Sequence, residues 1–271
     1  MRKKLSIILF ILIISIFTVA CSNKKEKDNS NVLVTLVLDK GGVNDESFNQ
    51  LAWEGAKKAS IEYGIKIKYL ESNTDADYKS NLEQAVDLDS NLIIAVGFNL
   101  SEALKEAAIY YPKSSFAIID GSFDKIPENV TNINFDEGEA GYLAGLASAK
   151  TLDGNKFGFI GGISVPAVEN YKEGFEKGLL EVNPNIELSV QYANSFSDAA
   201  KGKAIATQMY NNDINCIMSA GGGVNNGVYE VAREKGKYAV GVDMAQNYIS
   251  PKVILTSAIK KVDVGVENTI K

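Results

Sequence analysis

The segment GGVNDESFNQLAW combines polar and aromatic side chains that could hold a ligand. Asn44, Asp45 and Asn49 offer hydrogen-bonding groups, and Phe48 offers a ring that can stack on a planar molecule. A simpler interpretation is that Asp45 or Ser47 only caps a helix and that Phe48 belongs to a hydrophobic core. The segment therefore predicts a ligand-binding loop, with helix capping as the alternative.

Other carboxylates end apolar runs, where they could also do chemistry. Asp120 and Asp243 follow such runs, and together with Asp45 they leave acid–base catalysis by two carboxylates open. The 271 residues contain no histidine, which excludes histidine-dependent triads and argues against most zinc or non-haem iron sites. The nucleotide-binding, nucleophile-elbow and C-x-x-C motifs are absent as well. A redox or nucleotide-hydrolysing role is therefore disfavoured.

The elements that must position these residues alternate between short apolar runs and amphipathic stretches. Val32–Leu38 is a predicted strand, and a helix over 48–63 follows it. This alternation continues along the chain and is typical of an α/β fold with parallel sheets covered by helices. The loop between the first strand and its helix should point into the crevice beyond the carboxyl ends of the strands.

The alternation restarts near residue 136, which predicts two lobes. We expect 32–135 plus 248–271 to form the N-terminal lobe and 136–247 the C-terminal lobe, with their rims facing each other. The two halves show no repeat at the level of single residues. Phe98, which follows a predicted strand, is assigned to the core.

The first residues have the features of an export signal. A basic start and an apolar stretch in 1–21 end at Cys21, and the preceding Thr-Val-Ala resembles the lipobox of bacterial lipoproteins. We therefore expect a lipoprotein signal peptide, lipidation of Cys21 and a flexible polar tether over 22–31. These features place the body at the extracytoplasmic face of the cell membrane.

The charge of the body argues against a nucleic-acid partner. Without the leader, 25 Lys+Arg face 34 Asp+Glu, a net charge of −9. Only Cys216 remains in the body, so an internal disulfide is impossible. Its apolar neighbours predict a buried core thiol.

Several segments together resemble a known family. The segments are DESFNQLAWEG, FAIID, FDEGEAGYLAG, FIGG with EGFEKG, and GVD followed by LTSAIKKVD. In this order they resemble the basic membrane protein family of bacterial lipoproteins, of the purine nucleoside receptor A type. The resemblance implies the two-lobed periplasmic-binding-protein type I fold and a substrate-binding protein of a nucleoside ABC importer. The family normally continues past Lys271, so we expect this chain to be a truncated form.

The resemblance also implies roles for single residues around a purine base. Phe48 and Phe196 match the two rings, one from each lobe, that sandwich the base in such receptors. Asn44, Asp45 and Asn49 would then hydrogen-bond the edge of the base or the neighbouring sugar.

The remaining implied contacts concern the sugar. Asp120 and Asp243 match carboxylates expected near the ribose, and Lys260 matches a lysine that donates to ribose oxygens. Gly222 would let the backbone approach the ligand closely. One departure is Ala245, where family members often carry a second carboxylate.

We accordingly expect a monomeric, non-enzymatic receptor without cofactor or metal, which captures a purine nucleoside for an ABC permease. Another planar ligand, such as a pyrimidine nucleoside or a flavin, remains an alternative of the same class. A nucleoside hydrolase using Asp45 and Asp120 is an alternative of a different class, and a sensor that signals to a membrane partner is a third.

Overall fold

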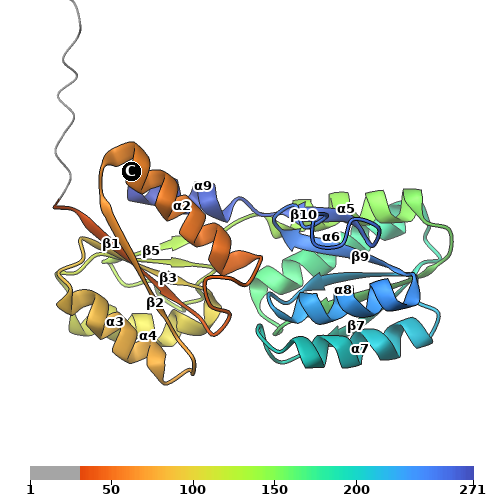
Figure 1. Cartoon of the computed structure of the whole chain (residues 1–271), viewed down its shortest axis with the longest axis horizontal. Helices are drawn as coiled ribbons and strands as arrows, with labels where there is room; N and C mark the ends of the chain where they lie inside the picture. Colours follow the sequence, from red (N-terminus) through yellow and green to blue (C-terminus); the bar gives the residue numbers. More distant parts are fainter. Residues whose placement is uncertain (1–30) are drawn as a thin grey trace, which may run out of the picture.

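The computed structural model describes residues 31–271. The predicted signal peptide, Cys21 and the tether up to residue 30 lie outside the described residues. Within 31–271, no helix is both long and apolar enough to cross a bilayer. The structure consists of two α/β lobes joined side by side (Figure 1).

The first lobe is a five-stranded parallel sheet with helices on both faces (Figure 1). Strand β1 buries Leu36 and Leu38 against α2 and α9 on one face, whereas Val37 lies with α3 and α4 on the other. Apolar residues on both faces explain why the strands appear in the sequence as short continuous apolar runs. The strand order is β2-β1-β3-β4-β5, and the elements are β1 Leu33–Leu38, α2 Phe48–Tyr63, β2 Lys66–Glu71, α3 Asp77–Asp87, β3 Leu92–Val96, η1 Phe98–Leu100, α4 Ser101–Tyr110, β4 Phe116–Ile119, β5 Val130–Ile133 and α9 Val262–Ile270.

The second lobe has the same architecture. Phe157 and Phe159 of its strand β6 pack with α5 and α6, and Ile160 packs with α7 and α8 on the opposite face. Cys216 is fully buried, which confirms the predicted core thiol. The strand order is β10-β9-β8-β6-β7, and the elements are α5 Glu137–Thr151, β6 Lys156–Gly161, α6 Pro166–Val182, β7 Glu187–Tyr192, α7 Ala199–Asn211, β8 Cys216–Ala220, α8 Val224–Lys235, β9 Tyr238–Asp243 and β10 Ile254–Ile259.

Both sheets follow one topology, although no residue repeat is visible in the sequence. In each lobe the first strand lies between the second and the third, so the strand order reverses beside β1 and beside β6. Ligands bind at such switch points, beyond the carboxyl ends of the strands. Asp120 follows β4 and Asp243 ends β9, the topologically equivalent strand, and both residues have positive φ angles, 57° and 66°.

The described chain passes from the first lobe to the second and later returns, and we call each connecting segment a crossing. The position of the second crossing corrects one prediction. The segment 248–271 was expected in the first lobe, but β10 pairs in parallel with β9 and buries Ile254 and Ala258 in the second lobe. Only α9 returns to the first lobe, where it lies along α2 (Figure 1). An apolar strand has the same sequence pattern in either sheet, so the pattern could not show which edge it joins. The crossing therefore lies between β10 and α9, and the other one lies between β5 and α5.

Candidate ligand-binding site

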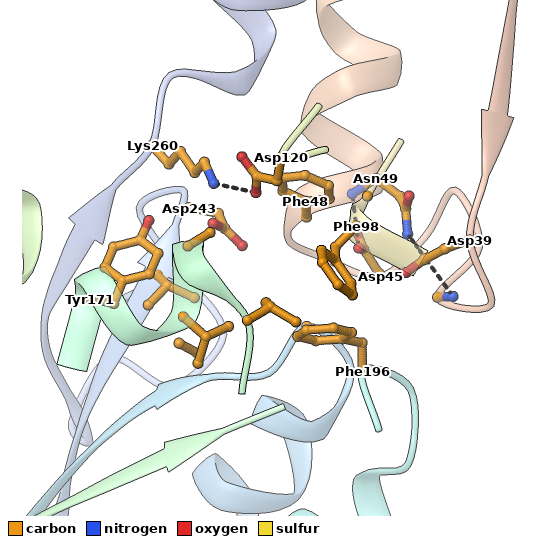
Figure 2. A pocket seen from close by; sticks show the side chains of 18 residues that line it. Asp39, Asp45, Phe48, Asn49, Phe98, Asp120, Tyr171, Phe196, Asp243 and Lys260 are labelled. Carbon is orange, nitrogen blue, oxygen red and sulfur yellow. Dashed lines mark hydrogen bonds and ion pairs between the residues drawn. The ribbon is translucent and has the colours of Figure 1, made fainter. Parts of the chain in front are cut away.

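A cavity lies between the two lobes, at the carboxyl ends of their strands. Figure 2 shows three phenylalanine rings along its middle, with polar side chains at either end. Of the nine predicted contact residues, only Asn44 does not line it, because that side chain is exposed to solvent. The other eight are brought together from both lobes: Asp45, Phe48, Asn49, Asp120, Phe196, Gly222, Asp243 and Lys260.

The aromatic walls come from opposite lobes. Phe48 is the first residue of α2, and Phe196 lies in the loop after β7. Two glycines hold Phe196 in place, since a methyl group on Gly162 would lie 2.3 Å from its ring and one on Gly222 would lie 2.8 Å from its carbonyl oxygen. Gly222 also has a φ of 57°, a conformation that favours glycine. These residues fix one face of an apolar slot.

Phe98 forms a third wall, which corrects its assignment to the core. It stands in the 3-10 turn η1 after β3 and is only partly buried. Its ring lines the cavity and packs against apolar residues of the second lobe. The sequence contains a signal for this position, because Phe98 follows a predicted strand and a glycine, where site residues of this fold lie. In the structure that glycine, Gly97, has a φ of 107°.

One end of the cavity is a buried cluster of charges around Lys260. The Lys260 Nζ atom lies 2.5 Å from Asp120 and 2.7 Å from Glu137, and its side chain is 3% exposed. The backbone N–H of Lys260 donates to the carbonyl oxygen of Asp243. Nζ also lies 5.2 Å from the centre of the Phe48 ring, so the charges adjoin the aromatic slot.

Burial and pairing have opposite effects on the pKa values in this cluster. Burial tends to lower the pKa of Lys260, but Asp120, Glu137 and Asp243 raise it above its usual value. Burial raises the pKa of Asp120 to about 6, although Lys260 opposes that shift. Burial likewise raises the pKa of Asp243. The lysine is therefore charged at neutral pH and compensates carboxylates that are costly to bury.

Glu137 is a site residue that the sequence reasoning missed. It opens α5, directly after the first crossing between the lobes, and is 3% exposed. It contacts Lys260 at the second crossing, so the pair connects the two crossing segments. A glutamate inside the motif FDEGEAGYLAG looks like a surface residue, and only its buried partner shows its role.

Two hydrogen bonds join the lobes directly. The Ser47 hydroxyl donates to Asp243 at 2.5 Å, and the Gln246 side-chain amide donates to the carbonyl oxygen of Glu46 at 2.9 Å. Asp45 directly precedes Glu46 and Ser47 in the chain and accepts backbone N–H groups from Ser47, Asn49 and Gln50. Asp45 therefore caps α2 and lines the cavity as well. Its hydrogen bond to a ligand stays a prediction.

Asp45 gives a prediction for the dependence of stability on pH. Burial is the main cause that raises its pKa from 3.8 to about 6, despite the three N–H groups that it accepts. Because the folded protein then holds this proton more tightly than the unfolded chain, the contribution of Asp45 to stability is greatest below pH 4 and falls as the pH rises through 6. From pH 4 to 7 wild type should lose up to about 3 kcal/mol of unfolding free energy relative to Asp45→Asn, measured by urea denaturation.

Asp77→Asn provides the matched control for this titration. Asp77 is the first residue of α3, where the N–H groups of Thr74 and Asn73 lower its pKa. From pH 4 to 7 the free energy of unfolding of wild type should therefore rise relative to Asp77→Asn, the opposite direction to Asp45→Asn. A difference in unfolding free energy between wild type and Asp45→Asn that stays constant over this pH range would contradict the raised pKa of Asp45.

The arrangement of these side chains suits the binding of a ligand. Its apolar walls suit a flat molecule, and its charged end suits hydroxyl groups. Among residues 31–271, no group of three or more Cys, Asp or Glu side chains could hold a metal ion.

Comparison with known proteins agrees with this geometry. Residues 32–271 match the family model of the PnrA-like ABC transporter substrate-binding proteins. The chain is 37% identical to the ABC transporter nucleoside-binding protein BmpA of Lactococcus lactis, over 91% of this chain and 76% of the relative. It is 38% identical to basic membrane protein A of Borreliella burgdorferi, over 96% of this chain and 76% of the relative.

A solved structure confirms the predicted type of fold. The crystal structure of an ABC transporter solute-binding protein from Aeropyrum pernix has a TM-score of 0.79 and 29% identity, over 88% of this chain and 70% of that one. The match supports the periplasmic-binding-protein type I fold and the prediction of a non-enzymatic protein. The chain therefore belongs to the PnrA-like family of ABC transporter substrate-binding proteins.

Proposed function

We propose that this substrate-binding protein captures purine nucleosides and delivers them to an ABC permease. The observation that carries the proposal is the pair Phe48 and Phe196, which come from opposite lobes and line one slot that ends at Lys260. A purine base would stack between the rings, and its ribose would lie at the charged end. The printed name of the Lactococcus lactis relative, a nucleoside-binding protein, supports this assignment.

The charged end has the donors and acceptors that a ribose requires. Asp120 and Asp243 can accept hydrogen bonds from a vicinal diol, and Lys260 can donate to a sugar oxygen. The described carboxylates around the cavity outnumber its lysine, which favours a neutral ligand over a phosphorylated one. We therefore expect nucleosides to bind and the corresponding nucleotides to be rejected.

Binding is coupled to the arrangement of the lobes. The contacts from Ser47 to Asp243 and from Gln246 to Glu46 join the two rims beside the cavity. A ligand that contacts both lobes would stabilise this arrangement and present a joint surface to the permease. One chain supplies all these groups, so we propose that it acts as a monomer.

We also propose that lipid on Cys21 anchors the protein at the extracytoplasmic face of the membrane. The basic and apolar leader before Cys21 supports this, and the polar residues 22–31 supply a tether. An anchor would keep the binding lobes close to the permease.

Calorimetry with the protein and a panel of ligands tests the function. We expect binding of guanosine, inosine or adenosine, and at least 100-fold weaker binding of the matching 5′-monophosphates. Uridine, cytidine and riboflavin are included as the other planar ligands. Binding of riboflavin or a pyrimidine nucleoside in preference to every purine nucleoside would contradict the proposal, and so would the absence of heat with all purine nucleosides.

A further inference from the structure

We infer that Met244 and Gln246 form a latch between the lobes, which raises the affinity for every ligand of the site without contacting the ligand. The two residues follow β9, in the loop that leads to β10. Neither is among the described residues that line the cavity. The inference concerns how the lobes are held together, and it rests on the proposed function only for the ligands that its test uses.

Met244 is the apolar part of the latch. Its side chain is partly buried and packs against the core cluster that β1, α2 and α9 form in the first lobe. Among the described residues of that cluster, Met244 is the one that comes from the second lobe. Its backbone N–H donates to the carbonyl oxygen of Val242 at 2.8 Å, so the second lobe holds the residue in place. The apolar surface at this contact is therefore removed from water only while the lobes are together.

Gln246 is the polar part of the latch, and the second lobe fixes its orientation. Its side chain is 1% exposed, and Oε1 accepts the Tyr229 hydroxyl at 2.6 Å and the Val242 N–H at 3.1 Å. Exchanging the amide oxygen and nitrogen would place an N–H group against the Val242 N–H. The donor Nε2 is therefore directed to the first lobe, where it donates to the carbonyl oxygen of Glu46 at 2.9 Å.

The first lobe meets the latch with residues that do not serve their own helix. Glu46, whose carbonyl oxygen accepts from Gln246, has a φ of 55°, a conformation that is costly without glycine. Ser47 stands at the N-cap of α2, but its hydroxyl does not cap the helix and donates to Asp243 of the second lobe. Asp45 supplies the cap instead. The turn before α2 is thus arranged for contact with the second lobe.

These contacts act on binding through the closed arrangement, in which the lobes are in contact beside the cavity. A ligand that touches both lobes binds this arrangement, so its apparent affinity is reduced by the fraction of the protein that is closed. Contacts that stabilise the closed arrangement without touching the ligand change that fraction equally for every ligand. The latch therefore sets the level of affinity, whereas the cavity residues set the choice among ligands.

Met244→Ala tests the apolar part, because it truncates the side chain that packs across the lobes and leaves the cavity lining unchanged. We expect the dissociation constants of guanosine, inosine and adenosine, measured by calorimetry, to rise by one common factor of about 5- to 30-fold. Met244→Leu keeps the apolar volume and should recover most of the lost affinity. The control Leu180→Ala removes an exposed apolar side chain of α6 outside the cavity and should bind like wild type.

Gln246→Glu tests the polar part. One carboxylate oxygen can still accept from Tyr229 and Val242, while the other would face the carbonyl oxygen of Glu46. The measurement is made at pH 8, and the two retained donors favour the ionised carboxylate. The affinity for each of the three nucleosides should fall at least ~10-fold. The control Gln208→Glu introduces the same charge at an exposed position of α7 and should leave the affinity unchanged.

Small-angle X-ray scattering tests the latch without a ligand. Because the latch contacts need no ligand, Met244→Ala and Gln246→Glu should each have a larger radius of gyration than wild type without nucleoside, and the two controls should not. Equal radii in all these proteins, or a loss of affinity for one nucleoside alone, would overturn the inference and leave the proposed function standing. The absence of binding by every purine nucleoside would overturn the proposed function, and the scattering comparison would then decide on the latch.

Discussion

Replacing Lys260 by methionine is expected to lower the free energy of unfolding by about 3–5 kcal/mol at pH 7 and to abolish nucleoside binding. Methionine preserves most of the length of the side chain but removes its charge. Asp120 and Glu137 would then be buried at one point without a compensating cation. An uncompensated buried charge is costlier than the loss of an exposed ion pair, which explains the size of the effect.

Urea denaturation measures this change, and Lys261→Met is the matched control. Lys261 is the exposed neighbour of Lys260 on the same crossing segment, so its replacement should change stability by less than about 0.5 kcal/mol. The defect of Lys260→Met should shrink at pH 5, because Asp120 has a pKa of about 6 and becomes protonated. Equal stability of the two variants at pH 7 would show that the lysine does not compensate the cluster.

Replacing Phe196 by alanine is expected to weaken purine nucleoside binding by about 10- to 100-fold. The substitution removes the wall that the second lobe contributes to the slot, while Phe48 remains. Stacking is sequence-tolerant because each base has a π face, so guanosine, inosine and adenosine should weaken by similar factors. The relative affinities of guanosine, inosine and adenosine should therefore change little in this variant.

Two further variants separate stacking from a general loss of structure, each measured by calorimetry together with thermal unfolding. Phe196→Leu retains apolar volume without a ring and should recover only part of the lost affinity. Tyr248→Ala removes an exposed aromatic residue of the second lobe that does not line the cavity, and should bind like wild type. Unchanged affinity in Phe196→Ala would contradict the proposed sandwich.

The elements and most of the site could be predicted because their signals are local. The helix 48–63 was predicted with the bounds that the structure shows, since an apolar strand, two glycines and a polar cap precede it. The loops after strands carry the site in this fold, so residues at predicted strand ends were good candidates. Asp120 and Asp243 were found in this way, and both line the cavity.

The missed residues have signals that are not local. Glu137 and Asp39 were not among the predicted site residues. Their places at the site follow from their contacts with Lys260 and Asn49, which do not adjoin them in the sequence. Asn44 failed for the opposite reason, because it lies next to contact residues along the chain but its side chain points to solvent. Position in a loop does not settle the direction of a side chain.

The sequence by itself determined the α/β class, the two lobes, the family and the residue types of the slot. Periodicity, turn residues and short motifs carry that information locally. The tertiary structure alone decided that β10 completes the second sheet, that both sheets repeat one topology, and that Lys260 neutralises a cluster from both lobes. It also decided that Asp39 lines the cavity and accepts a hydrogen bond from the side-chain amide of Asn49. These properties depend on contacts between residues far apart in the chain, which a pattern of neighbours does not encode.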